Sequence, residues 1–291
     1  MSKFQEDDGY SERRACGLLG LARSSCRYEP RTRPEEEELL RERIKELAHH
    51  HQRYGCPRMT AMLHREGWRV NKKRVHRIWK EEGLQLQRKP KRKRRGPSSE
   101  VINKAKYRDH VWSYDFAEDR TESGNKLRFL VVVDEYTREC LAIEVERSMG
   151  AREVIECLEW LFLVRGVPQY IRSDNGPEFV AKAVREWLEK EGCKTIYIEP
   201  GSPWENAYVE SFIGKFRDEC LNMELFRNVR EAQEIADAWK EEYNERRPHS
   251  SLGNLTPKEF AEAHSAATAL PSASPYLQKV REANPVIPVG T

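Results

Sequence analysis

The sequence contains no apolar run long enough to cross a bilayer, and no secretory signal pattern stands near its start. Its seven cysteines are scattered along the chain, and none of them forms a Cys-X-X-Cys pair. These absences argue against a membrane protein, a disulfide-stabilised secreted domain and a two-pair zinc finger. The composition therefore indicates a protein of the reducing cytoplasm.

A sustained heptad repeat is also missing, so we expect no coiled-coil zipper. One weak zinc pattern remains, made of three consecutive histidines at 49–51 together with Cys56. The second cysteine pair that many structural zinc sites have is absent. We favour the simpler interpretation of a solvated helix end followed by a buried thiol.

Charge is plentiful but unevenly distributed along the chain. The net charge of +3 hides a basic front part, because residues 1–97 hold 26 Lys and Arg against 14 Asp and Glu, a net of +12. The remainder holds 25 against 34, a net of −9. This asymmetry favours polyanion binding in front and cation-dependent chemistry behind. Most of the acidic excess, however, suits solvated helix surfaces.

The front part has the pattern of three short helices. The first is expected to begin near Pro34, with acids in its first turn and histidines in its last, as the helix dipole favours. Two more follow over residues 57–67 and 71–83, each closed by glycine. This is the helix-turn-helix pattern, although a basic solvated helix in a small bundle is an alternative. The candidate DNA contacts on the second of these helices are Lys72, Lys73, Arg74 and Arg77.

A basic run separates this unit from the rest of the chain. Seven of the eight residues 88–95 are Lys or Arg, so the segment cannot pack into a core, and against DNA it would neutralise phosphates without reading sequence. The basic residues are Arg88, Lys89, Lys91, Arg92, Lys93, Arg94 and Arg95. We expect an arm (1–34), a helix-turn-helix domain (35–87), a basic linker (88–105), a catalytic domain (106–262) and a tail (263–291).

The second half of the chain has the pattern of a mixed α/β domain. Residues 110–117 alternate between large aromatic and other side chains, and two further β-rich runs follow, which predicts three antiparallel strands. A helix, a strand, a second helix and a fifth strand come next. This order predicts a ribonuclease-H-like mixed five-stranded sheet with flanking helices, preceded by the small all-α unit.

Three carboxylates are prominent within this half. Asp115 lies inside the first strand, Asp174 ends the fourth, and Glu210 lies in a later helix with 35 residues between the last two. An acid inside an aromatic strand is costly without a cation or hydrogen bonds, and two Mg²⁺ ions need oxygen ligands to clamp both oxygens of an in-line phosphoryl transfer. On the helix we expect Glu210 to be half-buried and Glu219 to face solvent. Asp134 fits a turn or strand-end role better.

With these motifs, the sequence resembles the DDE transposases of the retroviral-integrase superfamily. Within them it resembles the second-frame (OrfB) transposases of the bacterial "insertion sequence three" family. The matching segments are WSYDFAED, SDNGPEF, SPWENAYVESFIGKFRDE and YNERRPHSSLGNLTPKEF, and the likeness covers roughly residues 35–262. One departure is Cys56 in YGCPRM, where a bulkier side chain is expected, and it affects nothing catalytic.

The resemblance implies that Asp115, Asp174 and Glu210 bind two Mg²⁺ or Mn²⁺ ions. It implies metal-dependent cleavage at the ends of an insertion sequence, followed by attack of the exposed 3′-OH on another phosphodiester. Further DNA contacts are expected from Asn175, Asn206, Lys215 and Arg217. His249, in the tail motif, could contact DNA or order the tail.

The partners implied are double-stranded DNA, both terminal repeats and target, and further copies of this chain, since joining two ends requires at least two. The product of an upstream reading frame (OrfA) is a further expected partner, in a bacterial, nucleoid-associated setting. Three alternatives remain open. They are a ribonuclease-H-type nuclease that cuts without joining, a transposase-derived DNA-binding regulator, and a domesticated or guide-assisted recombination factor.

Overall fold

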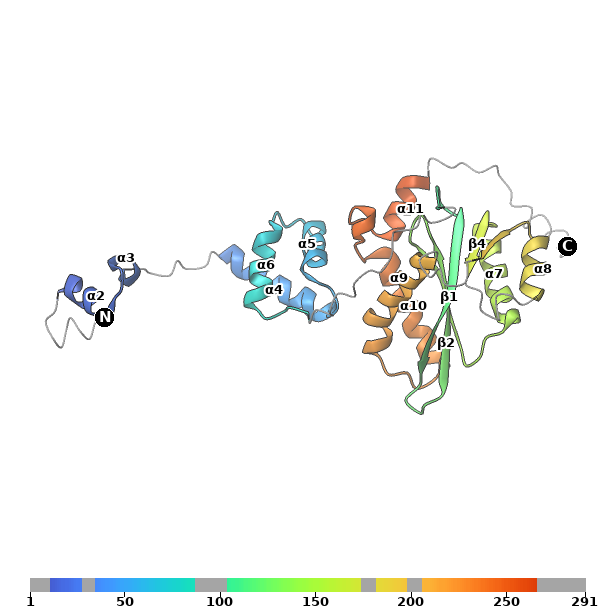
Figure 1. Ribbon diagram of the computed structural model, residues 1–291, viewed down its shortest axis with the longest axis horizontal. Coiled ribbons are helices and arrows are strands. Elements are labelled where there is room, and N and C mark those ends of the chain that lie inside the picture. Colours follow the sequence, from blue (N-terminus) through green and yellow to red (C-terminus); the bar gives the residue numbers. More distant parts are fainter. Residues whose placement is uncertain (1–10, 28–34, 87–103, 174–181, 198–205, 266–291) are drawn as a thin grey trace, which may run out of the picture.

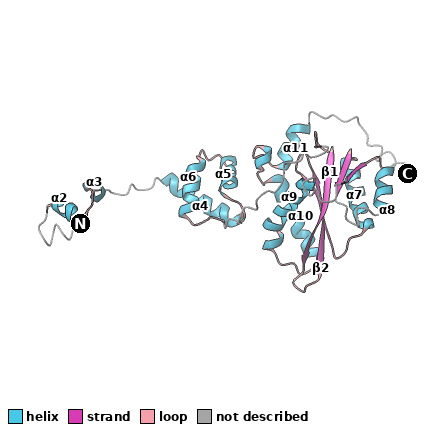
Figure 2. Cartoon of the chain, viewed as in Figure 1, coloured by secondary structure: helices cyan, strands magenta, loops and turns pink. Residues whose placement is uncertain are grey.

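The computed structural model describes residues 11–27, 35–86, 104–173, 182–197 and 206–265 (Figure 1). The predictions made for Asp174, Asn175 and the run 88–95 therefore lie outside the described residues. Two short helices, α2 (Glu12–Leu19) and α3 (Arg23–Cys26), stand at the front. An all-helical unit and a larger α/β unit follow along the chain (Figure 2).

The all-helical unit has the three helices expected from the sequence. They are α4 (Glu35–His50), α5 (Cys56–Arg65) and α6 (Lys72–Glu81). Asn71 caps α6, because its side chain accepts a hydrogen bond from the backbone nitrogen of Lys73 at 2.8 Å. Apolar residues of all three helices share one core. Arg41 is buried at its edge and pairs with Glu81 at 2.6 Å, so α4 is tied to the end of α6.

The α/β unit is built on a five-stranded mixed sheet in the order β3-β2-β1-β4-β5. The strands are β1 (Val111–Arg120), β2 (Lys126–Asp134), β3 (Cys140–Glu146), β4 (Tyr170–Ser173) and β5 (Lys194–Tyr197). The first three pair antiparallel, and β4 pairs parallel with both β1 and β5. This confirms the expected fold class, and it puts the strand that contains Asp115 at the centre of the sheet.

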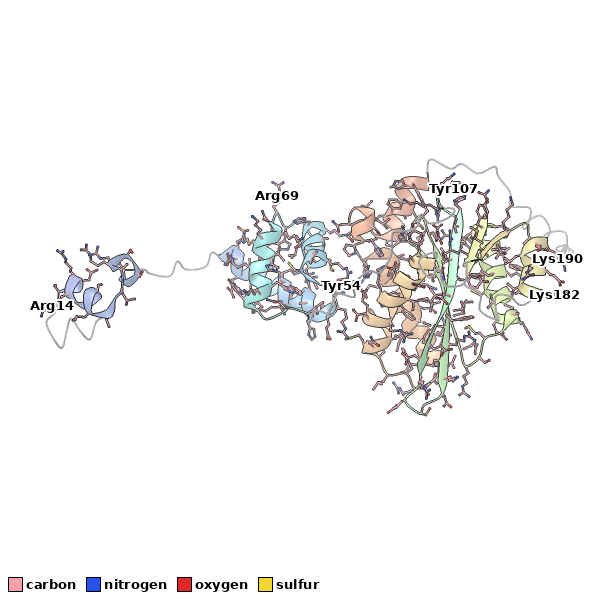
Figure 3. All side chains as sticks on the ribbon, in the orientation of Figure 1. Arg14, Tyr54, Arg69, Tyr107, Lys182 and Lys190 are labelled. Carbon is pink, nitrogen blue, oxygen red and sulfur yellow. The ribbon has the colours of Figure 1, made fainter. Side chains whose placement is uncertain are left out.

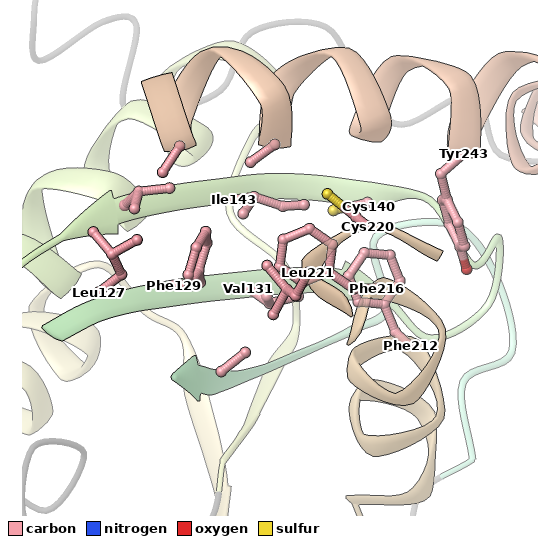
Figure 4. Close-up of a cluster of buried hydrophobic side chains, with 14 of the residues drawn as sticks. Leu127, Phe129, Val131, Cys140, Ile143, Phe212, Phe216, Cys220, Leu221 and Tyr243 are labelled. Carbon is pink, nitrogen blue, oxygen red and sulfur yellow. The ribbon is translucent and has the colours of Figure 1, made fainter. Parts of the chain in front are cut away.

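Helices cover both faces of the sheet. The helices and helical turns of this unit are α7 (Ala151–Arg165), α8 (Lys182–Lys190), α9 (Ala207–Glu219), η2 (Leu221–Met223), α10 (Val229–Glu245), η3 (Ser250–Leu252) and α11 (Pro257–Ser265). One apolar cluster joins the sheet to α7 and α8, and another joins it to α9 and α10. Figure 4 shows the second cluster, in which Phe129 of β2 meets Phe216 of α9 with ring centroids 5.5 Å apart.

The two clusters reveal which way each β1 side chain points. Trp112 and Tyr114 belong to the cluster with α7 and α8, whereas Ala117 belongs to the cluster with α9 and α10. Because side chains alternate along a strand, Ser113 and Asp115 point to the same side as Ala117. The face of the sheet that carries Asp115 is therefore the face that α9 covers.

Six of the seven cysteines have described side chains, and these contribute to packing and form no bridges. Cys16, Cys56, Cys140, Cys157, Cys193 and Cys220 are all free and buried. Burial raises the pKa of Cys157 to about 12 and that of Cys220 to about 12. Within the described ranges, no helix is both long and apolar enough to span a membrane.

Candidate active site

Asp115 sits in the middle of the central strand. Asp115 pairs with Val131 of β2, and its side chain is half-buried on the side of the sheet that α9 covers. The carboxylate oxygen Oδ1 accepts a hydrogen bond from the backbone nitrogen of Phe116 at 2.7 Å. β1 pairs with β2 along its length and with β4 as far as Ser113, so the backbone that carries this carboxylate is held in position.

Glu210 lies in the first turn of α9, the helix that packs on β1 and β2. Val209, Phe212 and Phe216 face the core and orient the helix. The Glu210 side chain is exposed, rather than half-buried as expected from the sequence, since it lies just beyond the apolar arc. Partial desolvation nevertheless raises the pKa of its carboxyl group. Glu210 thus presents a carboxylate at an accessible edge of the face that carries Asp115.

A buried polar network lies one pleat away from Asp115 along β1. Ser113 pairs in register with Arg172 of β4, and both side chains reach Glu135, the residue that follows β2. Arg172 Nε donates to Glu135 Oε1 at 2.8 Å, and the Ser113 hydroxyl donates to the same oxygen. Burial raises the pKa of Glu135, while Arg172 opposes that shift. In the sequence, the signal for this network is Arg172, a charged residue inside the short predicted strand that ends before Asp174.

Asp134 has the structural role expected for it. It ends β2 and is fully buried, and its carboxylate accepts hydrogen bonds from the backbone nitrogens of Asp109, Tyr136 and Thr137 at 2.6, 2.7 and 3.0 Å. Burial raises its pKa to about 6. The bonds from Tyr136 and Thr137 close the turn between β2 and β3, and the bond from Asp109 ties this turn to the residues before β1.

Glu219, at the end of α9, was expected to face solvent, and this expectation was wrong. Its side chain is 8% exposed and accepts hydrogen bonds from Arg247 at 2.6 and 2.7 Å. The tail motif that contains Arg247 folds back over the helix and covers Glu219. His249 is buried beside Arg247, with Nε2 3.3 Å from its guanidinium, so this histidine orders the tail.

Zinc binding by residues 49–51 with Cys56 finds no support. His51 Nδ1 instead lies 3.0 Å from Glu242, and Cys56 is buried in the core of the helical unit. Over the ranges that the structure describes, no three His, Cys, Asp or Glu side chains gather around one point. Asp174 is outside those ranges.

Comparison with known proteins decides the family. The integrase core domain matches residues 106–203 and, in a second family model, 191–257, and an HTH-like domain matches 34–93. A 31.7 kDa protein of insertion element IS407 from Burkholderia multivorans is 40% identical over 94% of this chain and 98% of that protein. The transposase of insertion sequence IS904 from Lactococcus lactis is 30% identical over 79% of this chain and 96% of that protein.

The chain belongs to the insertion-sequence transposases with an integrase core domain. Transposase InsF of insertion sequence IS3A from Escherichia coli is 25% identical over 72% of this chain and 77% of that protein, which confirms the relationship indicated by the motifs. Among solved structures, the match to the catalytic core domain of HTLV-2 integrase in complex with magnesium spans 53% of this chain and 97% of the integrase chain, with 17% sequence identity and a TM-score of 0.41. The integrase core domain and the insertion-sequence relatives make the transposase a polynucleotidyl transferase that acts on DNA.

The DNA-contact residues predicted on α9 of the transposase differ in exposure. Arg217 is exposed, two turns beyond Glu210, and donates to the carbonyl oxygen of Glu118 at 3.4 Å. Lys215 is half-buried, and burial, together with the charge of Arg247, lowers its pKa to about 8. Asn206 is only 3% exposed, which leaves no surface for a DNA contact in this conformation. Asn206 turns inward where α9 begins, and its DNA contact stays a prediction.

The basic residues of α6 fall into two groups. Lys72 and Lys73 are exposed at its beginning. Arg74 and Arg77 instead reach the acids of α4, where Arg77 lies 3.0 Å from Glu37. Ion pairs within the helical unit thus occupy two of the four predicted DNA contacts of the transposase.

Proposed function

We propose that Asp115, Asp174 and Glu210 form one divalent-metal site that cleaves insertion-sequence ends and joins the exposed 3′-OH to target DNA. The observation that supports it best is the strand arrangement. β4, which ends one residue before Asp174, runs parallel to β1, and α9 covers the face to which Asp115 points. Acids on two neighbouring strands and one covering helix would then converge.

The donor chemistry suits Mg²⁺ or Mn²⁺. Hard divalent cations prefer oxygen ligands, and each residue of the proposed triad carries a carboxylate. Asn206 lies one turn before Glu210. Its buried side-chain oxygen Oδ1 has no hydrogen-bond partner among the described residues, so it is a further oxygen donor beside the proposed triad. When bound, two such ions would supply charge stabilisation to the attacking and leaving oxygens of an in-line displacement.

The chain itself would contribute position and charge. Asp115 is held by the central strand, and Glu210 by a helix whose apolar side is anchored in the core, so their carboxylates need little reorganisation before the reaction. Arg217 stands seven residues after Glu210, about 10 Å along the same side of α9, where it can bind a DNA phosphate. This scheme uses water and a DNA 3′-OH as nucleophiles and needs no covalent protein–DNA intermediate.

The proposed partners follow from this chemistry. Two ends must be brought together, so the active form would contain at least two copies of the chain on DNA. Exposed Lys72 and Lys73, together with the run 88–95, would bind phosphates of the terminal repeats or target. A product of an upstream reading frame would complete recognition of the repeats.

The test is a cleavage and strand-transfer assay with the full chain and an oligonucleotide bearing a candidate element end, in Mg²⁺ or Mn²⁺ and in EDTA. Asp115→Asn and Glu210→Gln should still bind DNA but give no cleaved or joined product. Glu118→Gln is the matched control, because Glu118 is an exposed acid on the same strand. Activity retained in Asp115→Asn or Glu210→Gln would remove that residue from the site, and cleavage without joining would favour a nuclease.

A further inference from the structure

We propose that the segment 54–58 is a docking element that clamps the helix-turn-helix unit of the chain onto the end of α9. This inference goes beyond the catalytic proposal and stands without it. It concerns two sequence motifs that the chemistry does not use, YGCPRM at 54–59 and RRPHSSL at 246–252.

The centre of the junction is a shared carboxylate. Glu219 of α9 accepts from Arg247 of the tail motif and, at 3.2 Å, from Nη1 of Arg58 in α5. The side chains of Glu219 and Arg247 are 8% and 2% exposed. A buried carboxylate is strongly destabilising unless cations compensate it, and here one of its two cations comes from the helix-turn-helix unit.

Tyr54 seals this contact. It is 5% exposed, its ring lies under the guanidinium of Arg58 at 4.5 Å, and Arg247 approaches the same ring at 5.8 Å. His51 stacks on it with ring centroids 4.6 Å apart and planes at 7°. In Figure 3 Tyr54 lies on the side of the helical unit that faces the α/β unit, whereas Arg69 projects from the top of the helical unit.

Two peripheral pairs also join a basic side chain of the helical unit to an acid of the α/β unit. His51 Nδ1 lies 3.0 Å from Glu242 of α10. Arg65 of α5 pairs with Glu259 of α11 and donates to the carbonyl oxygen of Asn254 at 3.1 Å. In each ion pair across the junction the base belongs to the helix-turn-helix unit and the acid to the α/β unit. The basic front part and the acidic remainder of the sequence therefore also attract each other across this junction.

The junction links DNA binding to the helix that bears Glu210. Glu219 follows Glu210 by nine residues, which is about 13 Å along one continuous helix. A helix-turn-helix unit clamped at one end of α9 has a defined position relative to the carboxylate near the other end. Docking would therefore fix the distance between the DNA segment that is recognised and the phosphate that is cut.

Small-angle X-ray scattering of the full chain, without DNA or metal, tests the docking independently of the catalytic proposal. Arg58→Glu places a carboxylate against buried Glu219, and we expect a larger radius of gyration and maximum dimension. Arg69→Glu changes the net charge equally at an exposed position of the same unit and should leave the curve unchanged. Equal curves for wild type and Arg58→Glu would overturn the proposal.

The pair Arg65–Glu259 lies outside the apolar clusters and provides a charge swap, which also removes the bond from the Thr256 backbone nitrogen to Glu259 at 2.8 Å. In a NaCl titration followed by small-angle scattering, Arg65→Glu should lower the salt concentration at which the radius of gyration increases. Arg65→Glu combined with Glu259→Arg should restore the wild-type salt concentration. A swap that fails to restore compactness would contradict the docking. If the contact forms only when the scattering mass doubles with protein concentration, the helix-turn-helix unit docks on a second copy of the chain. That result would overturn the assignment of the contact to one chain.

Discussion

Arg172 and Glu135 form an ion pair with an Nε–Oε1 distance of 2.8 Å although both side chains are completely buried. Arg172 lies two residues before Asp174, and its register partner Ser113 lies two residues before Asp115. Because Ser113 donates to the same oxygen of Glu135, this pair ties β4 and β1 to the end of β2, one pleat before Asp115. Its role is to hold β1, β4 and the end of β2 in fixed relation.

Arg172→Met should destabilise the fold strongly. Removing one partner leaves an uncompensated buried carboxylate, which typically costs about 3–5 kcal/mol. Denaturant unfolding followed by circular dichroism measures the loss. Arg172→Met combined with Glu135→Leu should recover much of it, because no buried charge then remains. If the free energy of unfolding of Arg172→Met lies within about 0.5 kcal/mol of the wild-type value, this account is contradicted.

His249 should make stability depend on pH. Burial first, and then the positive charges of Arg247, Lys215, Arg58 and Arg138, lower its pKa from 6.5 to about 2. Arg247 donates to its Nε2, which fixes the neutral tautomer with the proton on Nδ1.

The sign of this dependence follows from linkage. Below pH 6.5 the unfolded chain takes up a proton that the folded chain refuses, so the contribution is full above pH 6.5 and falls with pH by up to about 1.4 kcal/mol per unit. Urea unfolding of His249→Gln should therefore show a shallower loss of stability between pH 7 and pH 5. His76→Gln, at an exposed position of α6, should retain the wild-type slope.

Two basic residues of α9 should behave differently on substitution. Arg217 is exposed, so Arg217→Ala should weaken cleavage of an element end while leaving the unfolding temperature unchanged. Lys215 is half-buried near Arg247, so Lys215→Met should affect stability more than DNA binding and can even raise stability by removing a repulsion. A larger loss of DNA affinity in Lys215→Met than in Arg217→Ala would reverse this assignment.

The two groups of basic residues on α6 should also separate in a salt titration. Lys72→Ala and Lys73→Ala should each lower the slope of log affinity against log salt by about 1 if each contacts one phosphate. Arg74→Ala should change the slope less, because Arg74 already pairs with Glu36 and Glu37. Fluorescence anisotropy with an unrelated duplex is the measurement, since phosphate contacts do not read sequence.

Local pattern was sufficient to predict the three helices of the helix-turn-helix unit, the five strands and α7, α8 and α9, but not α2, α3, α10 or α11. Alternation around Asp115 predicted a strand with that residue inside it, whereas the apolar spacing of α9 predicted a half-buried Glu210 that is exposed in the structure. Local pattern does not reveal partners far apart in the sequence. Glu219 looks like a surface acid until Arg247 and Arg58, distant in the chain, are seen to cover it. The same holds for Glu135, whose partner lies 37 residues away.

The buried thiols bear on how the protein can be labelled. A thiolate is the form that reacts with maleimides, and burial keeps Cys157, Cys193 and Cys220 protonated and enclosed at neutral pH. With Cys26 exchanged for serine, a cysteine placed at exposed Arg69 and another at exposed Lys182 would be the reactive pair. Fluorophores there would report the separation of the two units on single molecules, while the native thiols stay in place.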